Sequence, residues 1–278
     1  YEVVPIDGVG NEGDPSNEAS ATSDATSPTI SGGTLSGDNG YVDVTFSEGV
    51  YAGTDGTGAL TTSDVDYMFT QNGGSATDIS IDGVVKADGT GAALEGGEKT
   101  VRVQISVVGG PASGDETIEI IPAGGSSIYD GAGNPMGSGQ TTGTLSLNDR
   151  KPPTIASATT LDRDADGKVD AADVVFSEPI DDSEITPGDY EIAGTVVDAV
   201  DTEVSSGDAD TDDDRVQLQI TLDGGNEVGG TAVKEVTYTQ GTTADLAGNK
   251  LADVTEGDLS ETDGAAPVPL TAEAVSGK

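Results

Sequence analysis

The sequence contains no cysteine and no histidine, and these two absences exclude several classes of functional site. Without cysteine the chain has neither a disulfide framework nor a thiolate metal site. Without histidine it has no Ser-His-Asp triad, no histidine-based zinc site and no histidine-ligated haem. Enzyme chemistry is therefore heavily constrained before any motif is considered.

Positive charge is scarce: 11 Lys and Arg face 51 Asp and Glu, so the 278-residue chain has a formal net charge of −40. Such a chain repels nucleic acids and anionic membrane surfaces. No apolar run approaches the roughly 20 residues that span a bilayer. We therefore expect no nucleic-acid partner and no membrane insertion. An acidic surface that stays hydrated in molar salt indicates a halophilic source, and binding of multivalent cations is a competing or additional cause of the acidity.

Aromatic residues are few, with no Trp, 3 Phe and 7 Tyr, which leaves little surface on which sugars could stack. Paired carboxylates can hydrolyse glycosides, but here acidic residues are everywhere and no pair stands out. Short glycine-rich pieces such as residues 89–91 lack the third Gly and the following helix of a nucleotide-binding fingerprint. We predict that the protein is not an enzyme and has no catalytic residues.

Apolar residues occur in short alternating runs that are rich in Val, Ile, Thr and Tyr and bounded by Gly, Asp, Asn or Ser. This period of two indicates half-buried β-strands. No segment keeps a helical apolar stripe over three turns, so the sequence predicts an all-β fold. The clearest runs are residues 41–46, 101–107, 116–121, 216–222 and 233–238.

An internal repeat organises most of the chain, because five landmarks occur twice in the same order. They are Pro-Thr-Ile (28–30, 153–155), Val-x-Phe-Ser-Glu (44–48, 174–178), Asp-Tyr (66–67, 189–190), an alternating strand (101–105, 216–220) and Asp-x-Ala-Gly-Asn (130–134, 245–249). The repeat predicts two homologous domains at residues 28–149 and 152–263. An N-terminal arm and linker precede them at 1–27, and a tail follows at 264–278.

These landmarks resemble the bacterial and archaeal Ig-like domains of surface-layer proteins. The resemblance covers both repeats and is cleaner in the second, since the first has Gly49 in place of the usual Pro and Pro135 after its Ala-Gly-Asn turn. It implies tandem Ig-like β-sandwiches of about seven strands each on a secreted, extracellular or cell-surface protein. It implies little about any particular function.

The repeated aromatic residues have a physical role that does not depend on the resemblance. Phe46 and Phe176 are two of the three phenylalanines and lie inside apolar strands, so we expect each to anchor a sandwich core. Tyr67 and Tyr190 are the expected second core aromatics.

Each repeat also ends with a Gly-Asn pair, at 133–134 and 248–249, that suits a tight turn with a positive φ. The preceding Asp is expected to accept hydrogen bonds from the turn's backbone. One interpretation is a purely structural turn. The other is that Glu48 or Glu178 converges with this turn and holds a cation at one end of the domain.

The segment with the strongest chemical content is the loop at residues 162–173. With Gly at position 6, an apolar anchor at position 8 and carboxylates at alternate positions, it resembles the EF-hand and dockerin calcium loops. The expected ligands are Asp162, Asp164, Asp166, Lys168 through its backbone carbonyl, Asp170 and Asp173, at positions 1, 3, 5, 7, 9 and 12.

Two features of this loop depart from the calcium-loop pattern. Position 12 is Asp173 instead of Glu, which is one methylene shorter, and the flanks read as strands instead of helices. We therefore predict a calcium loop that joins two strands of the second domain. The alternative is a solvated acidic turn in a chain full of aspartates.

The N-terminal arm begins with a compact, β-prone apolar segment, residues 1–6, followed by a linker that is mostly polar and small. Such an end is normally disordered unless a partner holds it. We predict that Tyr1, Val3, Val4 and Ile6 form a donor strand that completes a sheet of a neighbouring subunit. The alternative is that the arm folds back onto its own domain.

A head-to-tail contact that does not close on itself propagates into a filament. The sequence therefore predicts a secreted, calcium-supported structural protein that self-assembles into a homopolymer, as an extracellular filament or surface layer. Two alternatives stay open: an adhesin or ligand-binding module of a cell-surface protein, and accessory domains of a secreted hydrolase.

Overall fold

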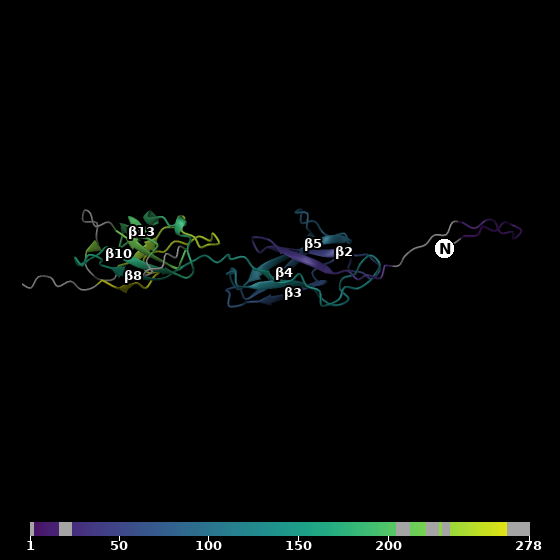
Figure 1. The fold of residues 1–278 in the computed structure, drawn as a ribbon, viewed down its shortest axis with the longest axis horizontal. Helices are drawn as coiled ribbons and strands as arrows, with labels where there is room; N and C mark the ends of the chain where they lie inside the picture. The colour runs from purple at the N-terminus through teal and green to yellow at the C-terminus, as the bar shows by residue number, and fades with distance from the viewer. Residues whose placement is uncertain (1–2, 17–23, 204–211, 221–227, 230–233, 266–278) are drawn as a thin grey trace, which may run out of the picture. The chain divides into compact units, whose positions relative to one another are not determined.

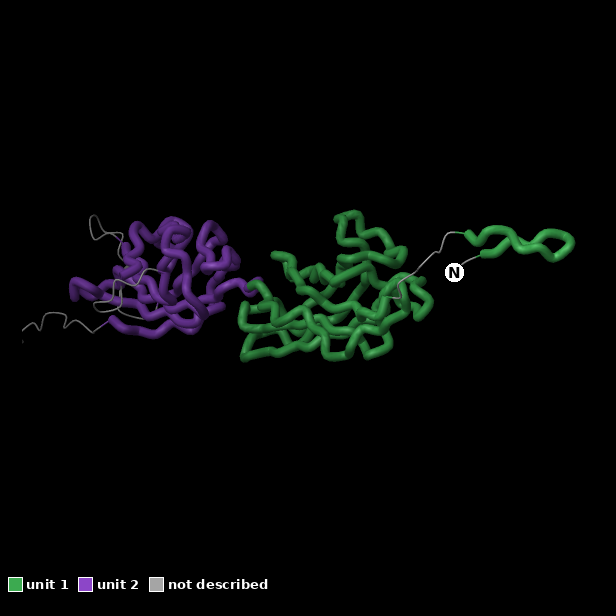
Figure 2. The backbone as a smooth tube through the Cα atoms, turned by 45° about the vertical axis from the view of Figure 1, so that its right-hand side comes forward, with its two compact units in different colours: residues 1–148 green, residues 149–278 purple. Residues whose placement is uncertain are grey.

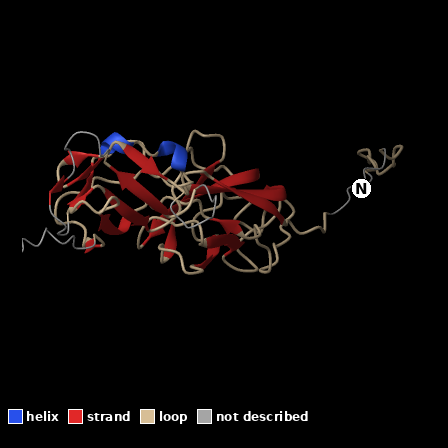
Figure 3. Ribbon diagram, turned by 60° about the vertical axis from the view of Figure 1, so that its left-hand side comes forward, coloured by secondary structure: helices blue, strands red, loops and turns tan. Residues whose placement is uncertain are grey.

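The computed structural model describes residues 3–16, 24–203, 212–220, 228–229 and 234–265. Within this part of the chain the predicted all-β fold is confirmed, because strands in several antiparallel sheets account for nearly all the regular structure (Figure 3). The helical residues described are two short 3-10 turns, η1 (Asp182–Glu184) and η2 (Pro187–Asp189). None of the described helices has the length and apolar character needed to cross a membrane.

The chain divides into two compact units, residues 1–148 and 149–278, and each has its own apolar core (Figure 2). The division after residue 148 falls next to the predicted end of the first domain at residue 149. That each unit is an Ig-like domain stays a prediction.

Unit 1 is built from two sheets around one core. One sheet has the order β1-β2-β5-β4 and the other β3-β6-β7. Figure 1 labels β2, β3, β4 and β5 of this unit. Alternate residues of β2, among them Val42, Val44 and Phe46, are at most 1% exposed, as the period of two requires. The strands are β1 (Ile30–Leu35), β2 (Tyr41–Val50), β3 (Val65–Thr70), β4 (Asp78–Lys86), β5 (Glu98–Val108), β6 (Thr117–Pro122) and β7 (Leu145–Ser146).

Unit 2 has a five-stranded sheet in the order β13-β14-β10-β8-β17, a three-stranded sheet β12-β11-β16 and the pair β15-β9. In the large sheet, β17 pairs in parallel with β8, while the other neighbours are antiparallel. The strands are β8 (Ile155–Leu161), β9 (Lys168–Val169), β10 (Ala171–Phe176), β11 (Tyr190–Ile192), β12 (Thr195–Val196), β13 (Ala199–Asp201), β14 (Arg215–Gln219), β15 (Val228–Gly229), β16 (Val236–Tyr238) and β17 (Thr262–Asp263).

The predicted core aromatics are buried, with one partial exception. Phe46 is 1% exposed, Phe176 is 2% exposed and Tyr190 is fully buried. The Tyr190 ring packs on Tyr238 with ring centroids 4.8 Å apart, and its hydroxyl donates to Thr243. Tyr67 is only half-buried, because its hydroxyl extends to the edge of the next sheet and donates to the Ile79 carbonyl at 2.7 Å.

The turn between β1 and β2 holds the end of unit 1 in place. Asn39 is 3% exposed, has a φ of 57° and donates through Nδ2 to the Asn148 carbonyl at 2.8 Å. Its Oδ1 accepts from the backbone and the side chain of Asn148, each at 2.9 Å. The turn therefore holds Asn148, the last residue of unit 1, in position.

The separate cores predict separate unfolding. Phe46→Ala should lower the stability of unit 1, and Phe176→Ala that of unit 2, each by about 3–5 kcal/mol, because each removes a buried aromatic and leaves a cavity. Calorimetry resolves the two unfolding transitions, and urea denaturation measures the free energy of unfolding of each unit. Each variant is the control for the other, and a single shared transition that both variants shift equally would contradict the two-core description.

Candidate metal centre

Residues 162–170 connect two neighbouring strands of the large sheet, β8 and β10, and residues 171–173 of the predicted loop belong to β10 itself. The Asp170 backbone amide donates to the Leu161 carbonyl at 3.0 Å and so closes the loop at its base. Inside the loop, Ala165 and Gly167 have φ values of 61° and 91°. The left-handed backbone at Gly167 is the conformation for which a calcium loop places Gly at its sixth position.

Backbone amides orient the acidic side chains of this loop. Asp162 accepts from the amide of Asp166 at 3.2 Å through Oδ1 and from that of Gly167 at 2.9 Å through Oδ2. Asp170 accepts from the Arg163 amide at 3.0 Å through Oδ1. These bonds hold the carboxylates from the two ends of the loop in fixed positions.

Three carboxylates converge as a result. One oxygen each of Asp162, Asp164 and Asp170 lies within 4.8 Å of the other two. Asp170 is 2% exposed, and its Oδ2 has no hydrogen-bond partner in the described part of the protein. Burial raises the pKa of Asp170, and the neighbouring charges of Asp164 and Asp162 act in the same direction. A buried carboxylate oxygen without a donor is costly unless a cation satisfies it.

The other predicted ligands lie outside this group. Asp166 pairs with the Lys168 ammonium at 3.0 Å and accepts from the Lys168 amide. Lys168 itself is in β9, opposite Gly229 of β15. Asp173 is in β10, where it accepts from Gln217 Nε2 at 2.8 Å. The structure thus brings together the residues at positions 1, 3 and 9. The side chains of Asp166 and Asp173 instead bind other side chains, those of Lys168 and Gln217.

The donor set fits a hard divalent cation. All three side chains offer carboxylate oxygens, which Ca²⁺ prefers, and the remaining places among its 6–8 ligands can be filled by carbonyls and water. There is no nitrogen or sulfur donor of the kind that zinc selects. A cation held by Asp162, Asp164 and Asp170 would satisfy the buried Asp170 carboxylate and stabilise the loop on the sheet.

Two further acidic groups occupy equivalent positions in the two repeats. Each combines a residue four positions before the opening Pro, the Glu of the Phe-Ser-Glu landmark and the Asp of the Asp-x-Ala-Gly-Asn turn. In each group one carboxylate oxygen per residue lies within 4.8 Å of the others. The groups are Asp24, Glu48 and Asp130 in unit 1, and Asp149, Glu178 and Asp245 in unit 2.

The two turns that contribute to these groups contain the same hydrogen bonds. Asp130 Oδ1 accepts from Ala132 and Asn134 amides at 2.8 Å, and its Oδ2 accepts from Asn134 Nδ2 at 2.7 Å. Asp245 makes the same three bonds, to Ala247 and Asn249, at 2.8–2.9 Å. The Gly before each Asn has a φ of 86° or 83°, so the turn forms as the sequence predicts.

Both interpretations of the Gly-Asn landmark therefore have a geometric basis: the Asp organises the turn, and the Glu converges on it. Burial raises the pKa of Glu48 and of Glu178, and the nearby carboxylates raise them further. Burial alone would also raise the pKa of Asp130, but the bonds from Asn134 and the turn backbone outweigh it and lower that pKa. A cation at these two groups stays a prediction.

Sequence reasoning missed the third member of each group, Asp24 and Asp149. Both lie in linker-like segments where an acidic residue attracts no notice in a chain of this composition. The available signal was their identical spacing, four residues before Pro28 and four before Pro153.

Comparison of the chain with protein-family profiles, curated proteins and solved structures finds no match in any of the three.

Removal of one loop carboxylate should abolish the stabilisation of unit 2 by calcium. Calcium at a hundredfold excess over its Kd should stabilise unit 2 by about 2.7 kcal/mol, because it binds only the folded loop. Asp164→Ala, at an exposed position, should lose this gain. Calorimetry with a chelator and then with calcium measures it. Glu191→Gln, which removes one charge from β11 of the same unit, should keep the gain, and an unchanged response in Asp164→Ala would contradict the site.

Glu178→Gln should stabilise unit 2 when a chelator is present, by up to about 1 kcal/mol at pH 7. A raised carboxyl pKa means that the folded state disfavours the ionised form, so stability falls as the pH rises through that pKa. The amide does not ionise, and the advantage of the variant should vanish under acid conditions where Glu178 is protonated. Melting curves from pH 4 to pH 8 measure this, with Glu191→Gln as the control. An equal gain at every pH would contradict the assignment to ionisation.

Proposed function

We propose that the protein is a structural subunit of an extracellular filament or surface layer, in which calcium stabilises the folded units and the N-terminal arm joins successive copies. The observation that carries the calcium part is the buried Asp170, which has one side-chain oxygen without a partner in the described chain and belongs to one group with Asp162 and Asp164. A cation bound at this site would hold the loop on the sheet and make the unit more rigid, as a subunit of an extracellular filament requires.

The N-terminal arm supports the assembly part. Its described residues, 3–16, are all exposed. Of the eight large apolar side chains that are exposed in the described chain, four belong to this arm: Val3, Val4, Ile6 and Val9. Tyr1, the remaining residue of the predicted donor strand, lies outside the described residues. Apolar side chains concentrated on one exposed segment favour a contact with another surface.

The backbone of the arm is suited to strand addition. Residues 3–6 turn back on residues 12–16: the Gly13 amide donates to the Pro5 carbonyl at 2.8 Å and the Ser16 amide to the Val3 carbonyl at 2.9 Å. Because backbone groups alternate between the two edges of a strand, those of Val4 are directed to the outer edge. The arm is thus a short hairpin with one edge open to a further strand.

Replacement of the arm's apolar side chains should prevent assembly without unfolding either unit. Electron microscopy of the purified chain in molar salt with calcium should show filaments or sheets. The triple variant Val3→Ser, Val4→Ser and Ile6→Ser should show none, while both melting transitions stay unchanged, because neither core includes these residues.

Val9→Ser, at the turn of the same hairpin, is the matched control and should assemble normally. A wild-type chain that remains monomeric at all protein and salt concentrations would contradict the proposed function, as would filaments formed by the triple variant.

A further inference from the structure

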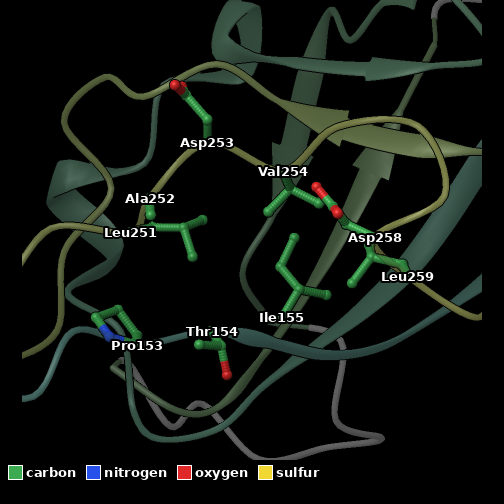
Figure 4. Close-up of a pocket in the computed structure, with 9 residues that line it drawn as sticks. All are labelled: Pro153, Thr154, Ile155, Leu251, Ala252, Asp253, Val254, Asp258 and Leu259. Atoms are coloured by element: carbon green, nitrogen blue, oxygen red, sulfur yellow. The ribbon is translucent and has the colours of Figure 1, made fainter.

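Unit 2 has an apolar groove at one edge of its large sheet. The groove has a volume of about 200 Å³ and lies between the first residues of β8 and the segment that contains Leu251, Val254 and Leu259. Figure 4 shows the side chains of these three residues and of Ile155 directed toward a common space from the two segments. Val254 and Leu259 are only partly buried, so the groove leaves apolar surface exposed in this chain.

A strand edge borders this groove. β8 pairs with β10 on one side over its whole length. On its other side, β17 pairs only with Thr159 and Thr160. No described strand pairs with this side of β8 at Ile155, Ala156 or Ser157, so an additional strand can bind here through main-chain hydrogen bonds and place side chains in the groove.

In unit 1 the corresponding edge strand, β1, is covered on one face. Thr142 and Leu145 lie directly against Gly33 of β1, where an added Cβ would come within 2.7 Å of the Thr142 side chain. The last strand of unit 1, β7, pairs with β6 and contacts β1. In unit 2 the last strand instead pairs with β8, which leaves the 155–157 edge open. The last strands of the two units thus take different places, β7 beside β6 and β17 beside β8.

Charge restricts what can bind in this groove. Asp253 and Asp258 lie among the lining residues, and the whole chain carries a net charge of −40. A second copy can approach such a rim only through an uncharged segment. Residues 3–6 of the arm, Val-Val-Pro-Ile, are uncharged and apolar, and their outer edge is open. Residues 3–6 thus match the groove in polarity, and Glu12, which lies opposite Ile6 in the hairpin, is on the strand that faces away from their outer edge.

We propose that the groove between β8 and residues 251–259 of unit 2 is the acceptor for the arm of a second copy, whose residues 3–6 pair with β8 at Ile155–Ser157. This inference rests on the proposed function, since it names the surface that receives the arm. Each copy then donates an arm at one place and accepts one at another, and such a contact propagates when it does not close on itself.

The test uses two full-length variants that each lose one half of the contact. The triple arm variant keeps its groove. The groove variant Ala252→Phe keeps its arm, and fills the groove from an exposed lining position without removing a core residue. Ala199→Phe, at an exposed position of β13 on the opposite edge of the same sheet, is the matched control. Calorimetry verifies that every variant keeps both melting transitions.

Neither variant alone should form filaments. An equimolar mixture of the two should form a discrete heterodimer, because the intact arm of one variant can bind the intact groove of the other. Analytical ultracentrifugation measures this. Ala199→Phe should form filaments as the wild type does. The self-association Kd of Ala252→Phe should be raised at least tenfold over that of the wild type.

The outcomes that overturn the two proposals differ. Filaments formed by Ala252→Phe, when the arm variant forms none, would overturn the groove as acceptor and leave arm-dependent assembly in place. A mixture that remains monomeric would overturn exchange between copies, because an arm bound to its own chain cannot rescue a neighbour. Filaments formed by the arm variant would instead overturn the proposed function.

Discussion

Electrostatic repulsion is the constraint under which the rest of this structure is organised. Eleven basic side chains cannot neutralise 51 carboxylates. The described ion pairs are correspondingly few, and the best placed is the two-bond contact of Arg102 with Asp43, in which the guanidinium also covers the Tyr41 ring at 3.5 Å. Many other carboxylates accept hydrogen bonds from backbone amides in turns, which stabilises a negative charge without a basic residue.

The two units differ in the connection between two neighbouring strands at corresponding positions of their large sheets. In unit 1 the β1–β2 connection is a short turn whose Asn39 binds Asn148 through neutral hydrogen bonds. In unit 2 the β8–β10 connection is the long acidic loop, with a buried Asp170 oxygen that no described group satisfies. The first connection is complete with protein groups alone. We propose that a cation completes the second, which would make calcium a part of the architecture of unit 2.

Local patterns predicted the strands, the buried Phe46 and Phe176 and the positive-φ turns, because alternation and turn chemistry act over a few residues. They could not predict which acidic residues meet. Asp173 has the spacing of a ligand but lies in β10, where strand pairing places Gln217 beside it. Asp24 and Asp149 come from linker-like segments and join their groups only through tertiary structure. The open edge of β8 likewise depends on where the last strand, β17, pairs. A strand as short as β17 has almost no sequence pattern from which its pairing could be predicted.

Calorimetry of the chelated protein at 0.1 M and at about 2 M sodium chloride tests most directly the claim that repulsion between carboxylates governs this fold, since the Debye length falls from about 10 Å to below 3 Å over this range. Both melting transitions should rise in the concentrated salt. The rise should saturate once screening is complete, and added calcium should then raise the transition of unit 2 further. Equal melting temperatures at the two salt concentrations would contradict the account.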